Sequence, residues 1–221
     1  MIIGGLQKTT LIDYPGKVAA TVFLAGCNFR CPWCYSSELV LPEKIGKQPR
    51  ISEEEFFGFL ESKKGLLDGL VICGGEPTIN SGLPDFIKKI KDMGFLVKLD
   101  TNGSNPQVLK DLVNRNLIDY VAVDIKFSDD ARNKESVEFL KNSKKIDFEF
   151  RTTVVPGIHK KEDFVKIAEQ IGGSNVKYYL QSFRAEKTLN PEFENIKPYP
   201  DSYLKEIRDE VKNYFKICEI R

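Results

Sequence analysis

Apolar runs alternate with amphipathic stretches along most of the chain, and this alternation limits the fold more than any other feature. Six runs rich in β-branched and aromatic residues occupy 18–24, 69–72, 95–99, 120–123, 148–154 and 176–180. Stretches with helical spacing separate them. Near-continuous apolar strands joined by single helices are typical of parallel pairing through right-handed crossovers. We therefore expect an α/β fold with a parallel sheet.

Helix signals lie in the gaps between these strands. Ser52 followed by Glu55 makes a capping box for a helix that runs toward Lys63. Pro84 and Pro106 can each occupy the first turn of a helix. Further helices are expected over 134–142, over 162–171, and from Asp201, as a cap, to about Phe215.

Six strands are too few for a closed eight-stranded barrel, so we predict an incomplete (βα)6 barrel of the TIM type. A six-stranded doubly wound sheet is the structural alternative, because periodicity does not separate the two. The chain has 221 residues, of which 41% are hydrophobic, so a sizeable core can form. No repeat or linker divides it, and we predict a single domain over 1–221.

The charge balance and the hydropathy pattern exclude two classes of partner. Lys plus Arg total 33 and Asp plus Glu total 32, so the net charge of +1 gives no general argument for nucleic-acid binding. No stretch reaches the ~20 apolar residues that a membrane span needs, and the first residues lack the pattern of a signal peptide. We expect a cytoplasmic protein that binds neither nucleic acid nor membrane.

Polar or glycine-rich groups mark the carboxyl end of every predicted strand. They occupy 26–35, 73–78, 100–103, 124–126, 151–153 and 181–184. Taken singly they have simpler interpretations: 100–103 as a turn, Gly74-Gly75 as a βα turn, Asp124 and Lys126 as an ion pair. In parallel α/β folds, however, sites are built at this edge of the sheet. The repetition predicts one large site there.

Three of the five cysteines, Cys27, Cys31 and Cys34, lie within eight residues. Clustered cysteines in a cytosolic chain indicate metal or redox chemistry rather than disulfides. Structural zinc normally has four protein ligands, but no second Cys or His pair follows, and the single histidine, His159, is distant. A zinc site completed by Cys73 stays an alternative. An iron–sulfur cluster on three thiolates would leave one iron open to an external ligand.

The motif Cys27-x3-Cys31-x2-Cys34, with Trp33 before the last cysteine, resembles the signature of radical S-adenosylmethionine (SAM) enzymes. Residues 74–77, Gly-Gly-Glu-Pro, resemble the glycine-rich motif of that superfamily. The segments 11–17, 100–103, 124–126 and 154–157 are similar to the activating proteins of glycyl-radical enzymes. The nearest groups are the activators of anaerobic ribonucleoside-triphosphate reductase and of pyruvate formate-lyase. The resemblance extends from about Gly5 to the C-terminal helix.

The resemblance implies a radical SAM type of barrel and one [4Fe-4S] cluster held by Cys27, Cys31 and Cys34. In the family, the amino and carboxylate groups of SAM chelate the fourth iron. A flavodoxin- or ferredoxin-type donor is expected to reduce the cluster. In the family, an electron from the reduced cluster cleaves SAM to methionine and a 5′-deoxyadenosyl radical, and this radical removes a hydrogen atom from a backbone glycine of a large partner enzyme.

The resemblance also assigns contacts to SAM. Trp33 and Tyr35 flank the last ligand, where the family contacts the adenine; the simpler interpretation of Trp33 is a hydrophobic plug over the loop. Gly75 matches the glycine whose backbone approaches the amino group, and Asp124 and Lys126 match a charged pair that contacts SAM. The residues expected to bind the cofactor are Trp33, Tyr35, Gly74, Gly75, Glu76, Asp100, Asn102, Asp124, Ile125, Lys126 and Arg184.

Two positions depart from the family pattern, and two other functions stay open. Tyr35 stands where relatives often have His, and Arg184 stands where the pyruvate formate-lyase activator has a SAM-contacting His. No Cys-rich insert follows Cys34, so a single cluster is expected.

The alternatives are a radical SAM enzyme acting on a small metabolite, such as a carboxy-deazaguanine synthase, and a non-catalytic zinc-stabilised binding module. Cys73 and Cys218 receive no role.

Overall fold

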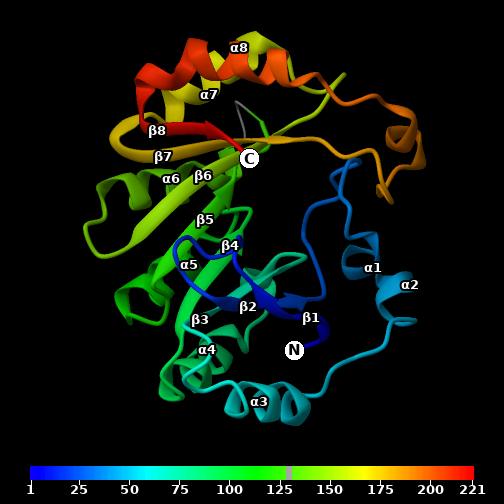
Figure 1. Ribbon diagram of the computed structural model, residues 1–221, viewed down its shortest axis with the longest axis vertical. Coiled ribbons are helices and arrows are strands. Elements are labelled where there is room, and N and C mark those ends of the chain that lie inside the picture. Colours follow the sequence, from blue (N-terminus) through cyan, green and yellow to red (C-terminus); the bar gives the residue numbers. More distant parts are fainter. Residues whose placement is uncertain (128–130) are drawn as a thin grey trace. The chain divides into compact units, whose positions relative to one another are not determined.

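A computed structural model describes residues 1–127 and 131–221 (Figure 1). Its strands are β1 (Ile3–Thr10), β2 (Ala19–Leu24), β3 (Gly69–Gly74), β4 (Leu96–Thr101), β5 (Tyr120–Asp124), β6 (Asp147–Val154), β7 (Gly173–Ser182) and β8 (Phe215–Ile220). Its α-helices are α1 (Ser37–Val40), α2 (Pro42–Ile45), α3 (Glu53–Glu61), α4 (Leu83–Asp92), α5 (Pro106–Asn114), α6 (Ala131–Asn142), α7 (Lys161–Ile171) and α8 (Asp201–Val211). Three short 3₁₀ turns are η1 (Pro77–Ile79), η2 (Pro191–Asn195) and η3 (Lys212–Tyr214).

The hydrogen-bonded strands follow their order in the chain, from β1 to β8. Strand β2 pairs in parallel with β3, β3 with β4, β6 with β7, and β7 with β8. The strands β2 to β7 are the six that the apolar runs predict, so the alternation of strands with helices is confirmed. Their runs are nearly continuous because both faces of an inner strand of a parallel sheet are covered.

The two outermost strands were not among the six predicted ones. Strand β1 runs antiparallel to β2, and its glycines and polar residues, Ile-Gly-Gly-Leu-Gln-Lys-Thr-Thr, hide it from a search for apolar runs. Strand β8 lies parallel to β7. The last helix ends earlier than the expected limit of about Phe215, since α8 ends at Val211 and the chain is extended again from Phe215.

The helix signals are largely confirmed, with shifts at the ends. Ser52 caps α3, since its side chain accepts a hydrogen bond from the amide of Glu55. Pro84 lies in the first turn of α4, and Pro106 is the first residue of α5. The expectation for Asp201 is wrong: it is the first helical residue of α8, Pro200 takes the cap position, and no side-chain cap bond forms. Helix α6 begins at Ala131, three residues earlier than expected.

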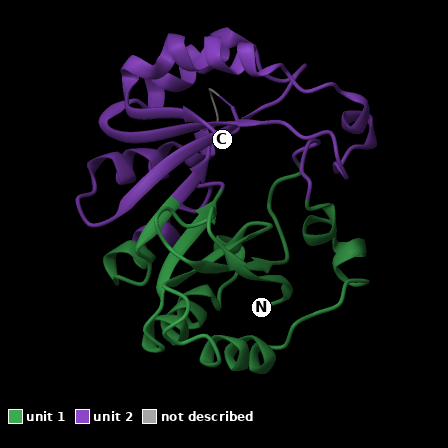
Figure 2. Ribbon diagram, viewed as in Figure 1, with its two compact units in different colours: residues 1–30, 36–101, 111–121 green, residues 31–35, 102–110, 122–221 purple. Residues whose placement is uncertain are grey.

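The chain divides into two compact units (Figure 2). Unit 1 comprises residues 1–30, 36–101 and 111–121, coloured green. Its helices α3 and α4 pack through the rings of Phe56 and Phe86, whose centroids are 5.1 Å apart. A second cluster of buried residues joins Tyr14 to Ala19, Val71 and Tyr120. The carboxyl ends of β2, β3 and β4 therefore belong to a packed body.

Unit 2 comprises residues 31–35, 102–110 and 122–221, coloured purple. It contains the sheet of β6, β7 and β8, with α7 packed on α8. Trp33, Val155 and Phe183 form a hydrophobic cluster in it. The prediction of a single domain over 1–221 stays a prediction. In the described part of the chain, no helix combines the length and the hydropathy needed to cross a membrane.

Candidate functional site

The loop after β3 packs against the loop after β2 in unit 1. The amide of Gly75 donates to the carbonyl of Leu24 at 2.8 Å, and the amide of Glu76 donates to the carbonyl of Gly26 at 2.8 Å. A Cβ atom on Gly75 would lie 1.9 Å from the Gly26 oxygen, and one on Gly74 would lie 2.4 Å from the Leu24 oxygen. Both glycines are therefore required by the backbone that leads directly into Cys27.

Cys27 follows this backbone contact and is also held locally. Its Sγ accepts a hydrogen bond from the amide of Phe29 at 3.4 Å, and its carbonyl accepts one from the guanidinium of Arg30 at 2.7 Å. Hydrogen bonds to sulfur favour the thiolate, which is the form that binds metal.

In unit 2, a segment distant in sequence holds the part of the cysteine loop that contains Cys31 and Cys34. The amide of Leu189 donates to the carbonyl of Cys34, and the amide of Asn190 donates to the carbonyl of Pro32, each at 2.9 Å. Within the loop, the amide of Cys34 donates to the carbonyl of Cys31 at 3.0 Å. Sequence reasoning did not find this support, because main-chain donors leave no side-chain pattern.

The donor chemistry of loop 27–34 fits an iron–sulfur cluster. All five cysteines lie among the described residues, and none of them forms a disulfide there; the loop contains no imidazole or carboxylate. Such a soft donor set suits iron–sulfur clusters, in which the thiolates bind separate iron atoms. Zinc needs four donors around one ion. Across residues 1–127 and 131–221, no group of three or more His, Cys, Asp or Glu side chains is placed to hold a single metal ion.

The two aromatic residues beside Cys34 lie in different surroundings. Trp33 is only 6% exposed and packs with Val155 and Phe183, which matches the hydrophobic plug. Tyr35 is 37% exposed and stacks on Phe183, with ring centroids 6.4 Å apart. Its hydroxyl accepts a hydrogen bond from the amide of Arg184 at 2.9 Å. Partial burial raises the pKa of the Tyr35 hydroxyl, so it stays neutral.

Glu76, expected to contact the cofactor, is fully buried in unit 1. Its Oε1 accepts hydrogen bonds from the Thr78 amide at 3.1 Å, the Thr78 hydroxyl at 2.5 Å and the Thr101 hydroxyl at 2.7 Å. These bonds connect the end of β3 to the end of β4. The buried carboxylate of Glu76 is therefore satisfied by neighbouring donors of the protein, and a contact of Glu76 with the cofactor stays a prediction.

Replacing Glu76 by glutamine should lower the free energy of unfolding by about 1.5 kcal/mol, because a neutral amide oxygen accepts less strongly than a carboxylate. The melting temperature of the purified protein should fall by roughly 3–6 °C. Glu61→Gln, in an exposed ion pair with Lys64, is the control and should change stability by less than about 0.5 kcal/mol. An unchanged melting temperature combined with weaker SAM binding would instead identify Glu76 as a ligand contact.

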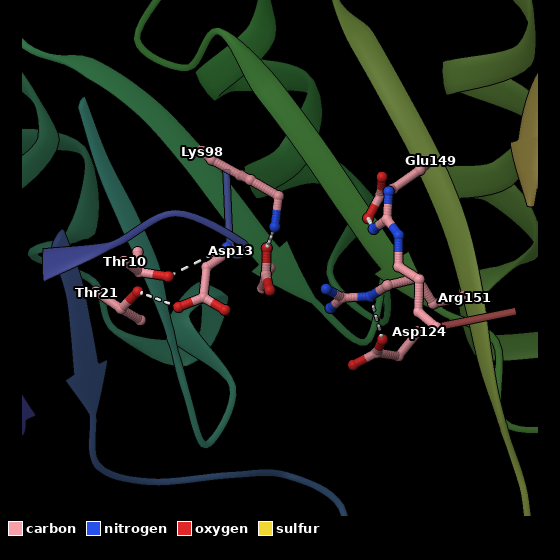
Figure 3. A network of polar contacts seen from close by, with 9 residues as sticks. Thr10, Asp13, Thr21, Lys98, Asp124, Glu149 and Arg151 are labelled. Carbon is pink, nitrogen blue, oxygen red and sulfur yellow. Dashed lines mark hydrogen bonds and ion pairs between the residues drawn. The ribbon is translucent and has the colours of Figure 1, made fainter. Parts of the chain in front are cut away.

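Residues 100–103 have two separate roles: Asp100 belongs to an ion pair, and Asn102 belongs to a turn. In unit 1, the ammonium of Lys98, itself 1% exposed, lies 2.5 Å from the carboxylate of Asp100 (Figure 3). In unit 2, the Asn102 side chain accepts a hydrogen bond from the amide of Ser104 at 2.9 Å, and Asn102 is 6% exposed. The turn interpretation therefore describes Asn102, whereas Asp100 is a carboxylate held by a buried cation.

Asp124, at the end of β5 in unit 2, pairs with Arg151 of β6. The guanidinium Nε of Arg151 lies 3.0 Å from the carboxylate, whose side chain is 37% exposed (Figure 3). The amide of Ile125 donates to the carbonyl of Arg151 at 2.7 Å, and the Ile125 side chain is buried. The structure thus records an ion pair of Asp124 with Arg151, where the simpler interpretation expected one with Lys126.

Arg151 is a functional candidate that the sequence signalled only weakly. Glu149, Arg151 and Thr153 alternate along β6, and alternate residues of a strand share a face. Glu149 is fully buried and pairs with the guanidinium of Arg221 at 2.9 Å. In unit 1, two threonines hold Asp13 (Figure 3). The amide of Asp13 donates a hydrogen bond to the hydroxyl of Thr10, and the carboxylate of Asp13 accepts one from the hydroxyl of Thr21. The sequence signal that could have identified Arg151 is the presence of charged residues at alternate positions of an otherwise apolar strand, β6.

His159, noted in the sequence only for its distance from the cysteines, lies in the core of unit 2. The ring is 2% exposed and contacts Trp33 edge to face, with centroids 6.0 Å apart. Its two nitrogens bond to the backbone of Val155 and of Lys126. Burial lowers the pKa of the imidazole, more than the Lys126 carbonyl and the Asp163 carboxylate raise it.

This lowered pKa predicts a pH dependence of stability. The unfolded chain takes up the proton near pH 6.5, whereas the folded protein does so only at lower pH. The contribution of neutral His159 to the free energy of unfolding is therefore fully present above about pH 6.5. It is lost as the pH falls below this value, by at most about 1.4 kcal/mol per pH unit. A comparison of the melting temperatures of the wild-type protein and of His159→Gln at several pH values measures the pH-dependent contribution of His159 to stability. Parallel curves would mean that folding leaves the pKa of His159 unchanged.

Comparisons with known proteins agree with this geometry. Residues 21–171 match the family model described as the Radical SAM superfamily. A protein of Methanocaldococcus jannaschii named "Putative glycyl-radical enzyme activating enzyme" is 33% identical over all of this chain and 95% of its own length. A second protein of that organism with the same description is 28% identical, over 92% of this chain and 80% of its own.

Two further matches are more distant. A 7-carboxy-7-deazaguanine synthase of Thermococcus kodakarensis is 28% identical over 50% of each chain. The crystal structure of Streptococcus suis SuiB bound to S-adenosylmethionine has a TM-score of 0.65 at 12% identity, and covers 91% of this chain and 51% of its own. The expected fold class is confirmed as an α/β fold with a parallel sheet of the radical SAM type.

Proposed function

The chain belongs to the radical SAM superfamily, and from this premise we propose that it is an activating enzyme that generates a glycyl radical on a partner enzyme. The observation that carries the proposal is the set of three cysteines, Cys27, Cys31 and Cys34, none of which forms a disulfide in the described part of the chain. They supply three of the four ligands of a [4Fe-4S] cluster and leave one iron for SAM. The whole-length similarity to a relative described as an activating enzyme favours this reaction over others of the superfamily.

When bound, the reduced cluster and SAM supply a 5′-deoxyadenosyl radical that removes a hydrogen atom from a glycine of the partner. The chain itself must hold the three thiolates. Main-chain donors at Phe29, Leu189 and Asn190 support the loop that bears them. The electron donor in this proposal is a flavodoxin- or ferredoxin-type protein, and the partner is a large glycyl-radical enzyme.

Unit 2 offers groups of the right charge for SAM. The carboxylate of Asp124, half-exposed and oriented by Arg151, suits an ammonium group, and the ammonium of Lys126 suits a carboxylate. Tyr35 presents the more exposed aromatic face beside Cys34, and the hydrogen bond from Arg184 fixes its position. Because Trp33 is packed in the core, we assign the adenine contact to Tyr35.

Unit 1 contributes in a different way. Gly75 is held against Gly26 by the short backbone contacts described above, so its amino-group contact with SAM is a proposal carried by the family pattern. Asp100, neutralised by Lys98, is a second proposed contact. The reaction of a carboxy-deazaguanine synthase is the second candidate, supported by the partial match to the Thermococcus protein.

The proposal is tested by anaerobic reconstitution followed by incubation of the reduced protein with SAM and candidate glycyl-radical enzymes. We expect an EPR doublet that collapses when the partner contains deuterated glycine. Formation of 5′-deoxyadenosine without a doublet from any candidate would keep the superfamily assignment and overturn the activator assignment. Colourless protein that binds stoichiometric zinc after reconstitution would favour the binding module.

A further inference from the structure

We propose that His159 is a positioning residue for SAM, acting as a neutral imidazole that joins the backbone at Lys126 to the backbone at Val155. The inference rests on the proposed function, because Lys126 is there assigned to SAM. His159 lies two residues beyond the segment 154–157 and within the matched residues 21–171. Its role follows from two hydrogen bonds and from what surrounds the ring.

The hydrogen bonds determine the protonation state of His159. The amide of Val155 lies 3.0 Å from Nδ1, and the carbonyl of Lys126 lies 2.8 Å from Nε2. An amide can only donate and a carbonyl can only accept. Nδ1 must therefore be the acceptor, and Nε2 must carry the proton. Only the neutral Nε2–H tautomer makes both bonds.

The ring joins the segments that follow two neighbouring strands of the sheet, β5 and β6. Lys126 follows β5 and Val155 follows β6. Phe127, Phe164 and Trp33 surround the imidazole at centroid distances of 6.2, 5.7 and 6.0 Å. These contacts are apolar, so they fix the plane of the ring without competing for its nitrogens. The position of the Lys126 backbone, and with it the base of its side chain, depends on the bond to Nε2.

The same ring also supports the loop that carries the cysteines. Trp33 packs with Val155, and the partly buried Cys31 packs against this cluster. A shift of Val155 would therefore also displace the Trp33 side chain. An aromatic ring without nitrogens could fill the space, but it would leave the Val155 amide and the Lys126 carbonyl without this partner.

The experiment compares SAM affinity of the cluster-containing protein under anaerobic conditions in four forms: wild type, His159→Phe, His159→Gln and Phe164→Leu. His159→Phe should weaken SAM binding about tenfold, since a displaced Lys126 loses a charge-assisted contact. His159→Gln offers an acceptor and a donor at similar spacing and should stay within about threefold of wild type. Phe164→Leu removes packing against the ring but neither hydrogen bond, and should lower the melting temperature without this loss of affinity.

A second measurement does not depend on the variants. Because the chain has one histidine, ¹⁵N NMR of the oxidised protein at pH 7.5 reports a single imidazole, and we expect a protonated Nε2 and an unprotonated Nδ1. An imidazolium, an Nδ1–H tautomer, or wild-type SAM affinity in His159→Phe would overturn the inference. SAM binding without a glycyl radical on any partner would overturn the proposed activator function and leave the role of His159 intact. Absence of SAM binding by the wild-type protein would overturn both.

Discussion

Replacing any one of Cys27, Cys31 and Cys34 by alanine should abolish reductive cleavage of SAM, with a loss of at least about a thousandfold in the rate. The reason is that a cluster on two thiolates has lost a ligand that water replaces poorly. The measurements are iron and sulfide content after anaerobic reconstitution, the visible absorption of the cluster, and the yield of 5′-deoxyadenosine.

The chain provides its own controls for this prediction. Cys218 lies in β8, and burial raises its pKa to about 11, so at neutral pH it is a thiol and not a metal ligand. Cys73 lies in β3 and packs against the cluster of Tyr14, Ala19, Val71 and Tyr120. Cys218→Ala and Cys73→Ala should both retain full iron content and SAM cleavage.

The Cys73 variant also separates the cluster from the zinc alternative. A zinc site completed by Cys73 predicts that Cys73→Ala loses metal together with the loop variants. If all four of these variants lose stoichiometric zinc, the cofactor assignment is wrong, and the motif is a structural metal site.

Replacing Gly75 by alanine should lower the free energy of unfolding by about 3 kcal/mol and the melting temperature by roughly 10 °C. The added Cβ would lie 1.9 Å from the Gly26 oxygen and 2.6 Å from its carbonyl carbon. Both are main-chain atoms and neither can rotate away, so the backbone on one side of the contact must move. Since Cys27 follows Gly26, reconstitution of the cluster should also be less complete.

Gly58→Ala is the matched control. Gly58 lies within α3, and a Cβ there meets no atom within 4 Å. Alanine has the higher helix propensity, so this variant should be more stable by about 0.5–1 kcal/mol. If Gly75→Ala melts like the wild type, the contact between the two loops is looser than described. A loss confined to SAM affinity would point to Gly75 as a ligand contact alone.

The side-chain partners of Glu76 and Asp124 could not be predicted from the sequence, and the physical cause is the same for both. Glu76 belongs to a motif whose family pattern points to the cofactor, yet three hydroxyl and amide donors surround its buried oxygen. Asp124 pairs with Arg151, which is 27 residues away in the sequence. Local spacing specifies which residues share an edge of the sheet. It does not specify which of several charges becomes the partner, because that depends on side chains from neighbouring strands.

The two outer strands, β1 and β8, show that local sequence patterns also leave part of the fold unpredicted. The inner strands are apolar on both faces and therefore visible as continuous runs. Strand β1, with Gly4 and Gly5, pairs only with β2 among the strands and needs no such run. Strand β8 pairs with β7, and Lys216 and Glu219 interrupt its apolar residues, so it is not a continuous apolar run.

The sequence by itself determined the α/β class, the helix starts marked by capping or proline residues, and the three closely spaced cysteines that suit a cluster. These features depend on periodicity, turn chemistry and short spacing, which neighbouring residues specify. Only the tertiary structure decided that Trp33 is packed in the core, that Leu189 and Asn190 support the cysteine loop, and that His159 joins Lys126 to Val155. Those contacts link segments tens of residues apart, and their energies exist only when the chain is folded.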